Sequence, residues 1–142
     1  MDGLTLIWPV PGYYRVTSMY MTPERPNHRG IDIGRSLSPP RAIDGATVVA
    51  AAGGTVSAVA TGHRTMGNMV EVDHGGGLRT RYMHNRVNLA APGQAVAQGD
   101  AIALVGSTGS STAPHLHFEV ILGGAHVDPL SALPRRAPHN AG

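Results

Sequence analysis

The stretch NMVEVDHGGGLRTRYMH, residues 68–84, decides the fold because it predicts two neighbouring strands joined by a turn. In its first half, valines alternate with methionine, glutamate and aspartate, which is the period-two pattern of a strand with one buried face. Three glycines at 75–77 supply the backbone freedom that a tight turn needs, and residues 78–84 form the second strand. The stretch therefore predicts an antiparallel hairpin.

Short runs of the same kind lie on both sides of this hairpin, separated by turn-forming residues. Gly53 and Gly54 stand between two β-branched and alanine-rich runs, which predicts another hairpin. Proline-rich or polar loops are expected at 22–28, 35–45 and 107–114. The remaining expected strands are residues 13–21, 29–34, 46–52, 54–61, 101–106 and 115–122.

Length and composition point to one β-rich domain. A chain of 142 residues is long enough for a single core, and 19 glycines with 11 prolines suit many short strands and tight turns. No convincing amphipathic helix is present, although residues 128–133 have room for one turn. We expect an all-β fold, a single compact domain of antiparallel sheets with little or no helix. Its expected parts are an N-terminal lead-in over the surface at 1–12, the domain at 13–133 and a flexible C-terminal tail at 134–142.

Composition also argues against several functions. The net charge is +2 without a basic block, so no nucleic-acid partner is expected, and no apolar run approaches the roughly 20 residues of a membrane span. The N-terminus lacks the basic start and apolar stretch of a signal peptide. Cysteine is absent, which leaves histidine, aspartate and glutamate as metal ligands. All eleven basic residues are arginine, so lysine-dependent chemistry and lysine-linked carriers are excluded.

The stretch PHLHFEV, residues 114–120, places two histidines in one strand. Side chains of a strand alternate between faces, so His115, His117 and Glu119 share one face while the apolar residues between them face the core. The Cα atoms of the two histidines are roughly 6.5–7 Å apart in an extended strand. Both could bind one metal, one could bind while the other faces a substrate, or both could face solvent.

A second group of candidates lies in HRGID, residues 28–32. In a straight strand His28 and Asp32 would be roughly 13 Å apart, too far to share a metal. They converge only if the chain bends, and Gly30 at a loop-to-strand junction permits a bend. Otherwise His28 is an exposed loop residue and Asp32 caps a turn.

The stretch RYMH adds His84 at the end of the hairpin's second strand, at a sheet edge where functional groups often collect. By alternation, Tyr82 is expected on the same face as His84. His74 ends the first strand before the glycines, either as a turn residue or as part of a groove wall. The histidines expected to be ordinary are His63, His126 and His139.

Together HRGID, RYMH and GSTGSSTAPHLHFEV, in this order, resemble the lysostaphin-like (LytM-type) zinc metallopeptidases. The resemblance runs from about Trp8 to Pro129 and includes connecting pieces such as PGQAVAQGDAIALVGSTG. Each motif alone is weak, but three in order with matching connectors are specific. Members of this family cut peptide bonds within or between the stem peptides of bacterial peptidoglycan. The resemblance implies a zinc metalloendopeptidase, a peptidoglycan hydrolase with a groove that carries the metal site.

The family pattern implies separate roles for the candidate residues. His28, Asp32 and His117 correspond to the ligands of one zinc ion per chain. His84 and His115 correspond to catalytic histidines that contact the water or the substrate carbonyl. Two imidazoles and one carboxylate leave the open position that a catalytic zinc site needs. The residues expected to contact substrate or to orient an imidazole are Tyr82, Glu119 and His74, with Asp73 as a further candidate for orienting an imidazole.

Two other interpretations compete with the enzyme. A non-catalytic relative, a LytM-like module that binds wall or activates an amidase, resembles the fold but lacks ligand positions, whereas all five motif positions are occupied here. A carrier module is the second, since PGQAVAQGDAIALVG resembles biotinyl and lipoyl hairpins, but those need a lysine.

The expected enzyme is a monomer that acts on the bacterial cell wall. It could be extracellular, periplasmic or phage-delivered, as a bacteriolytic endolysin is. The residues leave open whether it cuts glycyl bridges or D-Ala–diaminopimelate crosslinks. The loops expected to line the groove and to set this choice are 22–28, 35–45, 61–68 and 107–114.

Overall fold

Strands account for nearly all regular structure in residues 5–134, the part of the chain that the computed structural model describes. The all-β prediction is confirmed, and the one helical turn follows Asp128, whose carboxylate accepts a hydrogen bond from the Leu130 amide. The elements are β1 (Val16–Ser18), β2 (Ile31–Ile33), β3 (Ser36–Leu37), β4 (Pro40–Arg41), β5 (Thr47–Val49), β6 (Gly54–His63), β7 (Gly67–Gly75), β8 (Leu78–Asn88), β9 (Ala95–Val96), β10 (Ala101–Val105), β11 (Leu116–Leu122), β12 (Ala125–Val127) and α1 (Pro129–Ala132).

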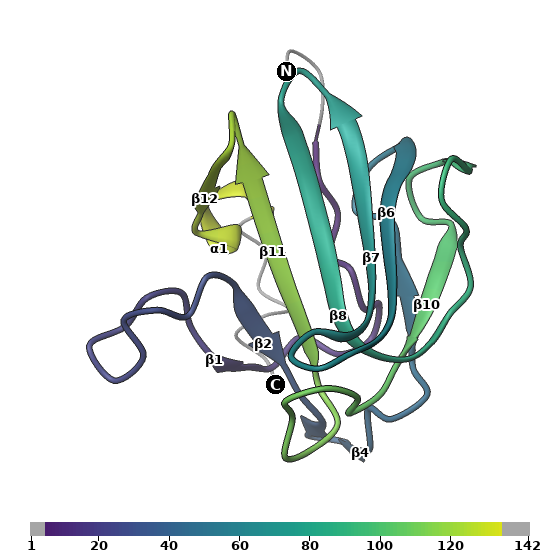
Figure 1. Ribbon diagram of the computed structural model, residues 1–142. Helices are drawn as coiled ribbons and strands as arrows, with labels where there is room; N and C mark the ends of the chain where they lie inside the picture. The colour runs from purple at the N-terminus through teal and green to yellow at the C-terminus, as the bar shows by residue number, and fades with distance from the viewer. Residues whose placement is uncertain (1–4, 135–142) are drawn as a thin grey trace.

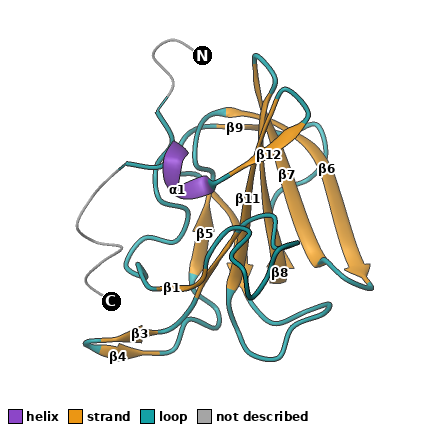
Figure 2. Cartoon of the chain, turned by 90° about the vertical axis from the view of Figure 1, so that its left-hand side faces the viewer, coloured by secondary structure: helices purple, strands orange, loops and turns teal. Residues whose placement is uncertain are grey.

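Ten of the described strands form one antiparallel sheet (Figure 1), in the order β1-β2-β11-β8-β7-β6-β9. Off this path, β10 pairs with β8 and β5, and β12 pairs with β11. The hairpin predicted at 68–84 is confirmed as β7 and β8, in which Glu71 lies opposite Arg81. Strands β3 and β4 form a separate small hairpin, seen at the lower left of Figure 2, where the sequence had suggested only a loop.

The hairpin predicted around Gly53 and Gly54 is wrong. Strand β5 pairs with β10, whereas β6 pairs with β7 and β9, so the two runs are not partners. A side chain at Gly54 would collide with the backbone carbonyl of Asp73 in β7. Glycine is therefore needed at 54 because two backbones approach closely, and not because the chain reverses there.

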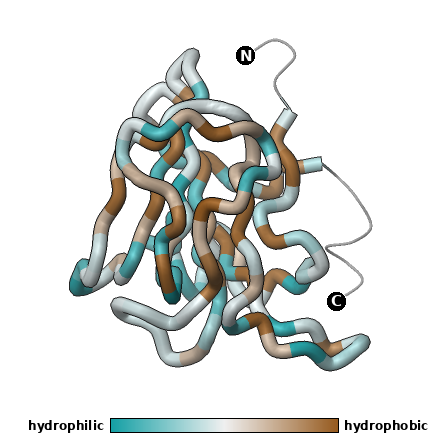
Figure 3. The backbone as a smooth tube through the Cα atoms, turned by 90° about the vertical axis from the view of Figure 1, so that its right-hand side faces the viewer, coloured by the Kyte–Doolittle hydropathy of each residue, from teal (hydrophilic) through white to brown (hydrophobic). Residues whose placement is uncertain are grey.

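The core lies on one face of this sheet, where fully buried side chains from β2, β7, β8 and β11 pack together. Hydrophobic and hydrophilic residues alternate along the strands in Figure 3, as a one-sided core requires. The segment at 5–12 is part of this core, since Leu6 and Val10 are buried and the Ile7 amide donates to the Ala51 carbonyl. The lead-in was expected to lie over the surface, but apolar burial holds it against the domain.

Residues 1–4 and 135–142 lie outside the described residues, so the tail expected at 134–142 is described only at Pro134. Within residues 5–134, no helix has the length and apolar character needed to cross a membrane.

A buried polar chain links β7 and β8 to the segment at 50–54. The Ala51 amide donates to the Tyr82 hydroxyl at 2.9 Å, which lies 2.6 Å from the Thr80 hydroxyl. Thr80 lies 2.8 Å from Nε2 of His74, whose Nδ1 lies 2.8 Å from the Gly53 carbonyl. A carbonyl only accepts, so Nδ1 carries the proton and each hydroxyl donates toward a neutral His74. Every polar group in this series of hydrogen bonds has a partner, which explains how the tyrosine hydroxyl can be fully buried.

This polar chain predicts a pH-dependent contribution to stability. Burial lowers the pKa of His74 below its usual value of 6.5, although the Gly53 hydrogen bond and the charge of Asp73 oppose this. The unfolded chain takes up a proton first, so the contribution is complete above pH 6.5 and is lost as the pH falls toward the folded pKa. Urea unfolding of the native protein and of His74→Gln, at the same zinc concentration, measures the free energy of unfolding at each pH. Between pH 7.5 and 5.5 this free energy should fall less in the variant than in the native protein. An equal loss in both would contradict this role.

Candidate functional site

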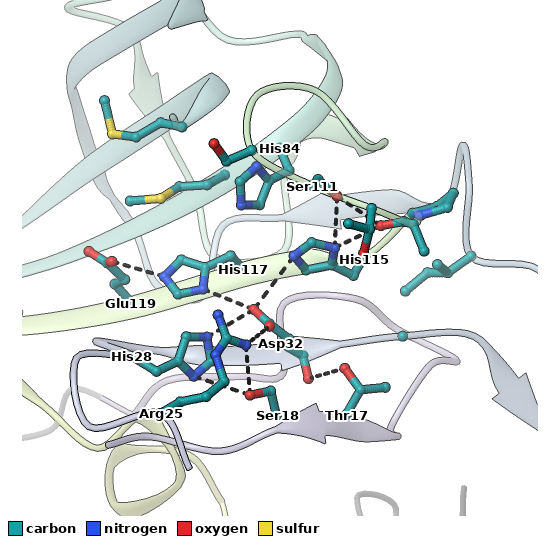
Figure 4. Close-up of a pocket in the computed structure, with 18 of the residues that line it drawn as sticks. Thr17, Ser18, Arg25, His28, Asp32, His84, Ser111, His115, His117 and Glu119 are labelled. Carbon is teal, nitrogen blue, oxygen red and sulfur yellow. Dashed lines mark hydrogen bonds and ion pairs between the residues drawn. The ribbon is translucent and has the colours of Figure 1, made fainter. Parts of the chain in front are cut away.

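Strand register brings residues far apart in sequence into one row. Asp32 in β2 lies directly opposite His117 in β11, which in turn lies opposite Met83 in β8. Figure 4 shows Asp32 and His28 from the β2 side facing His117 across this row. The bend that brings His28 close is confirmed, and a side chain at Gly30 would collide with a backbone carbonyl of β11. Close strand packing therefore explains the glycine in HRGID.

The three predicted ligands form a compact set of donor atoms. One donor atom from each of His28, Asp32 and His117 lies within 4.8 Å of the other two, and all three residues are buried. Nδ1 of His117 is 2.9 Å and Nε2 of His28 is 3.2 Å from the same carboxylate oxygen, Oδ1 of Asp32. Nε2 of His28 is nevertheless buried without a hydrogen-bond partner. An orphaned imidazole nitrogen facing two further donors fits a metal ion with nitrogen and oxygen ligands.

Hydrogen bonds fix which ring nitrogen each histidine presents. Nδ1 of His28 lies 2.8 Å from the Met19 carbonyl, so it carries the proton and Nε2 faces Asp32. His117 is reversed, because its Nε2 lies 2.9 Å from Oε2 of Glu119 and its Nδ1 faces the cluster. Glu119 thus orients His117 as a carboxylate commonly orients a metal-binding histidine. The sequence suggested Glu119 as a candidate for orienting an imidazole, and that role stays a prediction.

Buried opposite charges dominate the electrostatics of the cluster. Burial raises the pKa of the Asp32 carboxyl, but contacts with His117 and His28 outweigh it and hold that pKa well below its usual range. Burial likewise lowers the pKa of His117, yet its bonds to Asp32 and Glu119 reverse this and raise the pKa to about 9. Two carboxylates therefore hold a proton on His117, the proton that a metal ligand must give up.

The second pair of predicted histidines faces the same cluster from the other side (Figure 4). The rings of His84 and His115 have centroids 4.8 Å apart, and Nε2 of His115 lies 3.6 Å from Oδ1 of Asp32. Each ring is anchored through Nδ1, to the Thr108 carbonyl at 2.7 Å for His84 and to the Ala113 carbonyl at 2.8 Å for His115. Burial lowers the pKa of His84, which keeps its Nε2 a proton acceptor at neutral pH.

Tyr82 is a correction to the expected site, because it lies in the core and not in the groove. The expectation relied on strict alternation from Tyr82 to His84. His84, however, has a φ of 67°, a left-handed conformation that is uncommon outside glycine. This backbone conformation interrupts the alternation of side chains between the two faces of the strand, so Met83 and His84 both face the groove. His74 also lies outside the groove lining, in the buried polar chain with Tyr82.

A groove of about 1390 Å³ surrounds the cluster, larger than the roughly 300–1,000 Å³ of a typical small-molecule pocket. It is lined by residues of all four loops that the sequence assigned to its walls: 22–28, 35–45, 61–68 and 107–114. Of the orienting candidates, Glu119 lines the groove, whereas Asp73 contacts Arg79 on the sheet face. The sequence analysis did not identify Arg25, which donates a hydrogen bond to Oδ2 of Asp32.

Removing the orienting carboxylate should weaken metal binding. Glu119→Ala deprives His117 of its 2.9 Å partner and should lower metal affinity by about 10–100-fold, the usual effect of losing such a partner. Competition with a chromophoric chelator measures the affinity. Glu24→Ala is a matched control, since this glutamate makes no ion pair among residues 5–134 and does not line the groove. Equal affinity in both variants would contradict the orienting role.

This fold carries a set of three donors that could hold a metal ion. Residues 26–129 match the family model of Peptidase family M23, and the chain belongs to that family. The resemblance found in the motifs is thereby confirmed.

Relatives of known name fall into two kinds. Peptidoglycan DD-endopeptidase ShyA of Vibrio cholerae is 32% identical over 132 residues, covering 88% of this chain and 29% of ShyA. Murein hydrolase activator NlpD of Salmonella dublin is 36% identical over 129 residues, covering 91% of this chain and 31% of NlpD. A crystal structure of a zinc-containing peptidase from Vibrio cholerae superimposes with a TM-score of 0.76 at 34% identity, over 92% of this chain and 41% of that one. The chain spans about a third of the length of these curated relatives.

Proposed function

We propose that this chain is a zinc-dependent endopeptidase that hydrolyses peptide bonds in bacterial peptidoglycan. The observation that carries the proposal is the convergence of His28, Asp32 and His117, with one buried imidazole nitrogen left unpartnered. His28, Asp32 and His117 would hold one zinc ion. When bound, zinc supplies Lewis acidity that polarises a peptide carbonyl and makes water nucleophilic near neutral pH.

The other two histidines supply the proton chemistry in this proposal. Neutral His84, with its Nδ1 proton on the Thr108 carbonyl, accepts at Nε2 the proton that the attacking water loses. That proton then passes to the amine nitrogen as the carbon–nitrogen bond breaks. His115 keeps one proton on Nδ1 for the Ala113 carbonyl, so it would stabilise the negative charge on the carbonyl oxygen from Nε2 as the imidazolium. Anchoring of both rings through Nδ1 keeps these Nε2 atoms aimed into the groove.

An activator or wall-binding module is the alternative, because NlpD is among the similar proteins. Binding wall or activating another enzyme requires no set of converging metal donors. Nε2 of His28 is buried and faces Oδ1 of Asp32 at 3.2 Å without a hydrogen bond, and a metal bound between these donors would give that nitrogen a partner. Metal-assisted hydrolysis needs a donor set of this kind, so the donor set favours hydrolysis.

The charge of the groove lining favours a substrate with carboxylates. Arg15, Arg29 and Arg35 line the groove and have no ion-pair partner among residues 5–134. The lining acids are each paired, for example Asp44 with Arg86 at 3.8 Å. Stem peptides carry free carboxylates, whereas glycine bridges do not. We therefore favour stem-peptide crosslinks over glycyl bridges as the bonds cut, by a monomer acting at the cell wall.

Digestion of purified wall tests the function. The zinc-loaded chain is incubated with diaminopimelate-type and glycine-bridged peptidoglycan, and the products are identified by mass. New amino and carboxyl ends at stem-peptide crosslinks are the expected result. Release of products only after a separate amidase is added would establish the activator instead. Preferential cutting of glycine bridges would refute the substrate choice while leaving the endopeptidase intact.

A further inference from the structure

Asp32 uses its two carboxylate oxygens for different partners. Oδ1 faces the imidazoles of His28 and His117, whereas Oδ2 accepts a hydrogen bond from Nη1 of Arg25 at 3.0 Å. The same Nη1 donates to the Ser18 hydroxyl at 2.9 Å. Figure 4 shows the Arg25 guanidinium lying beside Asp32, on the side away from the His84 and His115 rings. One nitrogen of Arg25 therefore ties the carboxylate to β1.

The chain around Arg25 holds it in place for this contact. Residues 21–28 form a tight turn in which the Arg25 amide donates to the Thr22 carbonyl at 3.0 Å. The Arg25 carbonyl in turn accepts from the amide of His28 at 3.1 Å. The turn that positions Arg25 is thus the turn that positions a predicted ligand. Ser18 lies opposite Asp32 in the β1–β2 register, so both acceptors of Nη1 are fixed by the sheet.

We propose that Arg25 is a positioning residue for the metal site, holding Oδ2 of Asp32 so that Oδ1 is presented to the metal. The inference rests on the metal site of the proposed function. It assigns a role to an arginine whose side chain is 53% exposed and which would otherwise be a surface charge. Without this hydrogen bond Oδ2 loses its charged partner, and only the contacts of Oδ1 with His28 and His117 hold the carboxylate.

A positioning role and a simple charge role predict changes of opposite sign. Removing a cation next to a metal site favours the metal by Coulomb's law, so a charge effect alone would tighten binding. Loss of a hydrogen bond that orients a ligand typically weakens metal binding by about 10–100-fold. The sign of the change in affinity therefore separates the two roles.

The test measures zinc affinity of the full chain by competition with a chromophoric chelator. Arg25→Gln and Arg25→Ala are each expected to bind zinc about 10–100-fold more weakly than the native chain. Arg29→Gln is the matched control, because it removes an equal charge from the same groove without contacting Asp32. Its zinc affinity should be unchanged or slightly higher. Arg25→Lys, which keeps one cationic donor, should recover part of the loss.

A second readout is independent of affinity. The absorption spectrum of the cobalt(II)-loaded chain reports the coordination of the metal, and it should change in Arg25→Gln but not in Arg29→Gln. Native affinity and a native cobalt spectrum in both Arg25 variants would overturn the proposal. If the native chain itself bound no zinc, the metal site of the proposed function would fail, which is a different outcome.

Discussion

Replacing His117 with alanine is expected to abolish both metal binding and peptide hydrolysis. The change removes one of three converging donors and leaves Oε2 of the buried Glu119 without its 2.9 Å partner. Because loss of an orienting partner alone costs about 10–100-fold in affinity, loss of the ligand should cost more than about 100-fold. Metal content after dialysis against a weak chelator, measured with the rate of product release, checks both effects.

A histidine outside the groove provides the control for this variant. Nδ1 of His63 accepts hydrogen bonds from two amides of its own turn, and His63 does not line the groove. His63→Asn keeps an acceptor at that position and should retain metal and activity. Tight zinc binding by His117→Ala would contradict the assignment of His117 as a ligand.

Replacing His115 with alanine is expected to separate chemistry from metal binding. Its ring is anchored to the Ala113 carbonyl, and its Nε2 is 3.6 Å from Asp32, outside the set of three donors. The variant should keep its zinc and lose about 10²–10⁴-fold in kcat, the range for a positioned acid, base or charge-stabilising group. Steady-state hydrolysis of a soluble crosslinked muropeptide, with zinc content measured in parallel, distinguishes the two effects.

Two results for His115→Ala would contradict this prediction. Native kcat in this variant would show that His115 does not take part in the reaction. Loss of zinc together with activity would place His115 among the ligands, and the division between the two histidines of HLH would then be wrong.

Strand alternation predicted the site wherever the backbone is regular. The pattern of β11 placed His115, His117 and Glu119 on one face, and the structure has His117 and Glu119 there, 2.9 Å apart. The motif order predicted that distant residues meet, and the β2–β11 register supplies the reason for Asp32 and His117. Alternation along a regular strand depends only on neighbouring residues in the chain, so it can be predicted from the sequence.

Prediction from the sequence failed at residues whose role depends on an unusual backbone conformation or on a tertiary contact. Tyr82 was placed in the groove because nothing in RYMH shows that His84 adopts a left-handed backbone. Gly54 suggested a turn, whereas it permits close contact with the Asp73 backbone. Arg25 was missed because a long side chain that reaches across a turn leaves no periodic signal. These features depend on tertiary contacts, which spacing along the chain does not record.

Zinc dependence of bond cleavage is the most direct test of the central claim, that His28, Asp32 and His117 hold the metal of a peptidoglycan endopeptidase. The native chain is stripped with a chelator and titrated with zinc while the release of new amino groups from purified peptidoglycan is followed. Activity should be absent without metal, rise with zinc and reach its maximum at one equivalent, and Asp32→Ala should stay inactive throughout. Amino groups released at full rate by the stripped chain, or none released by a chain holding one zinc, would contradict the claim.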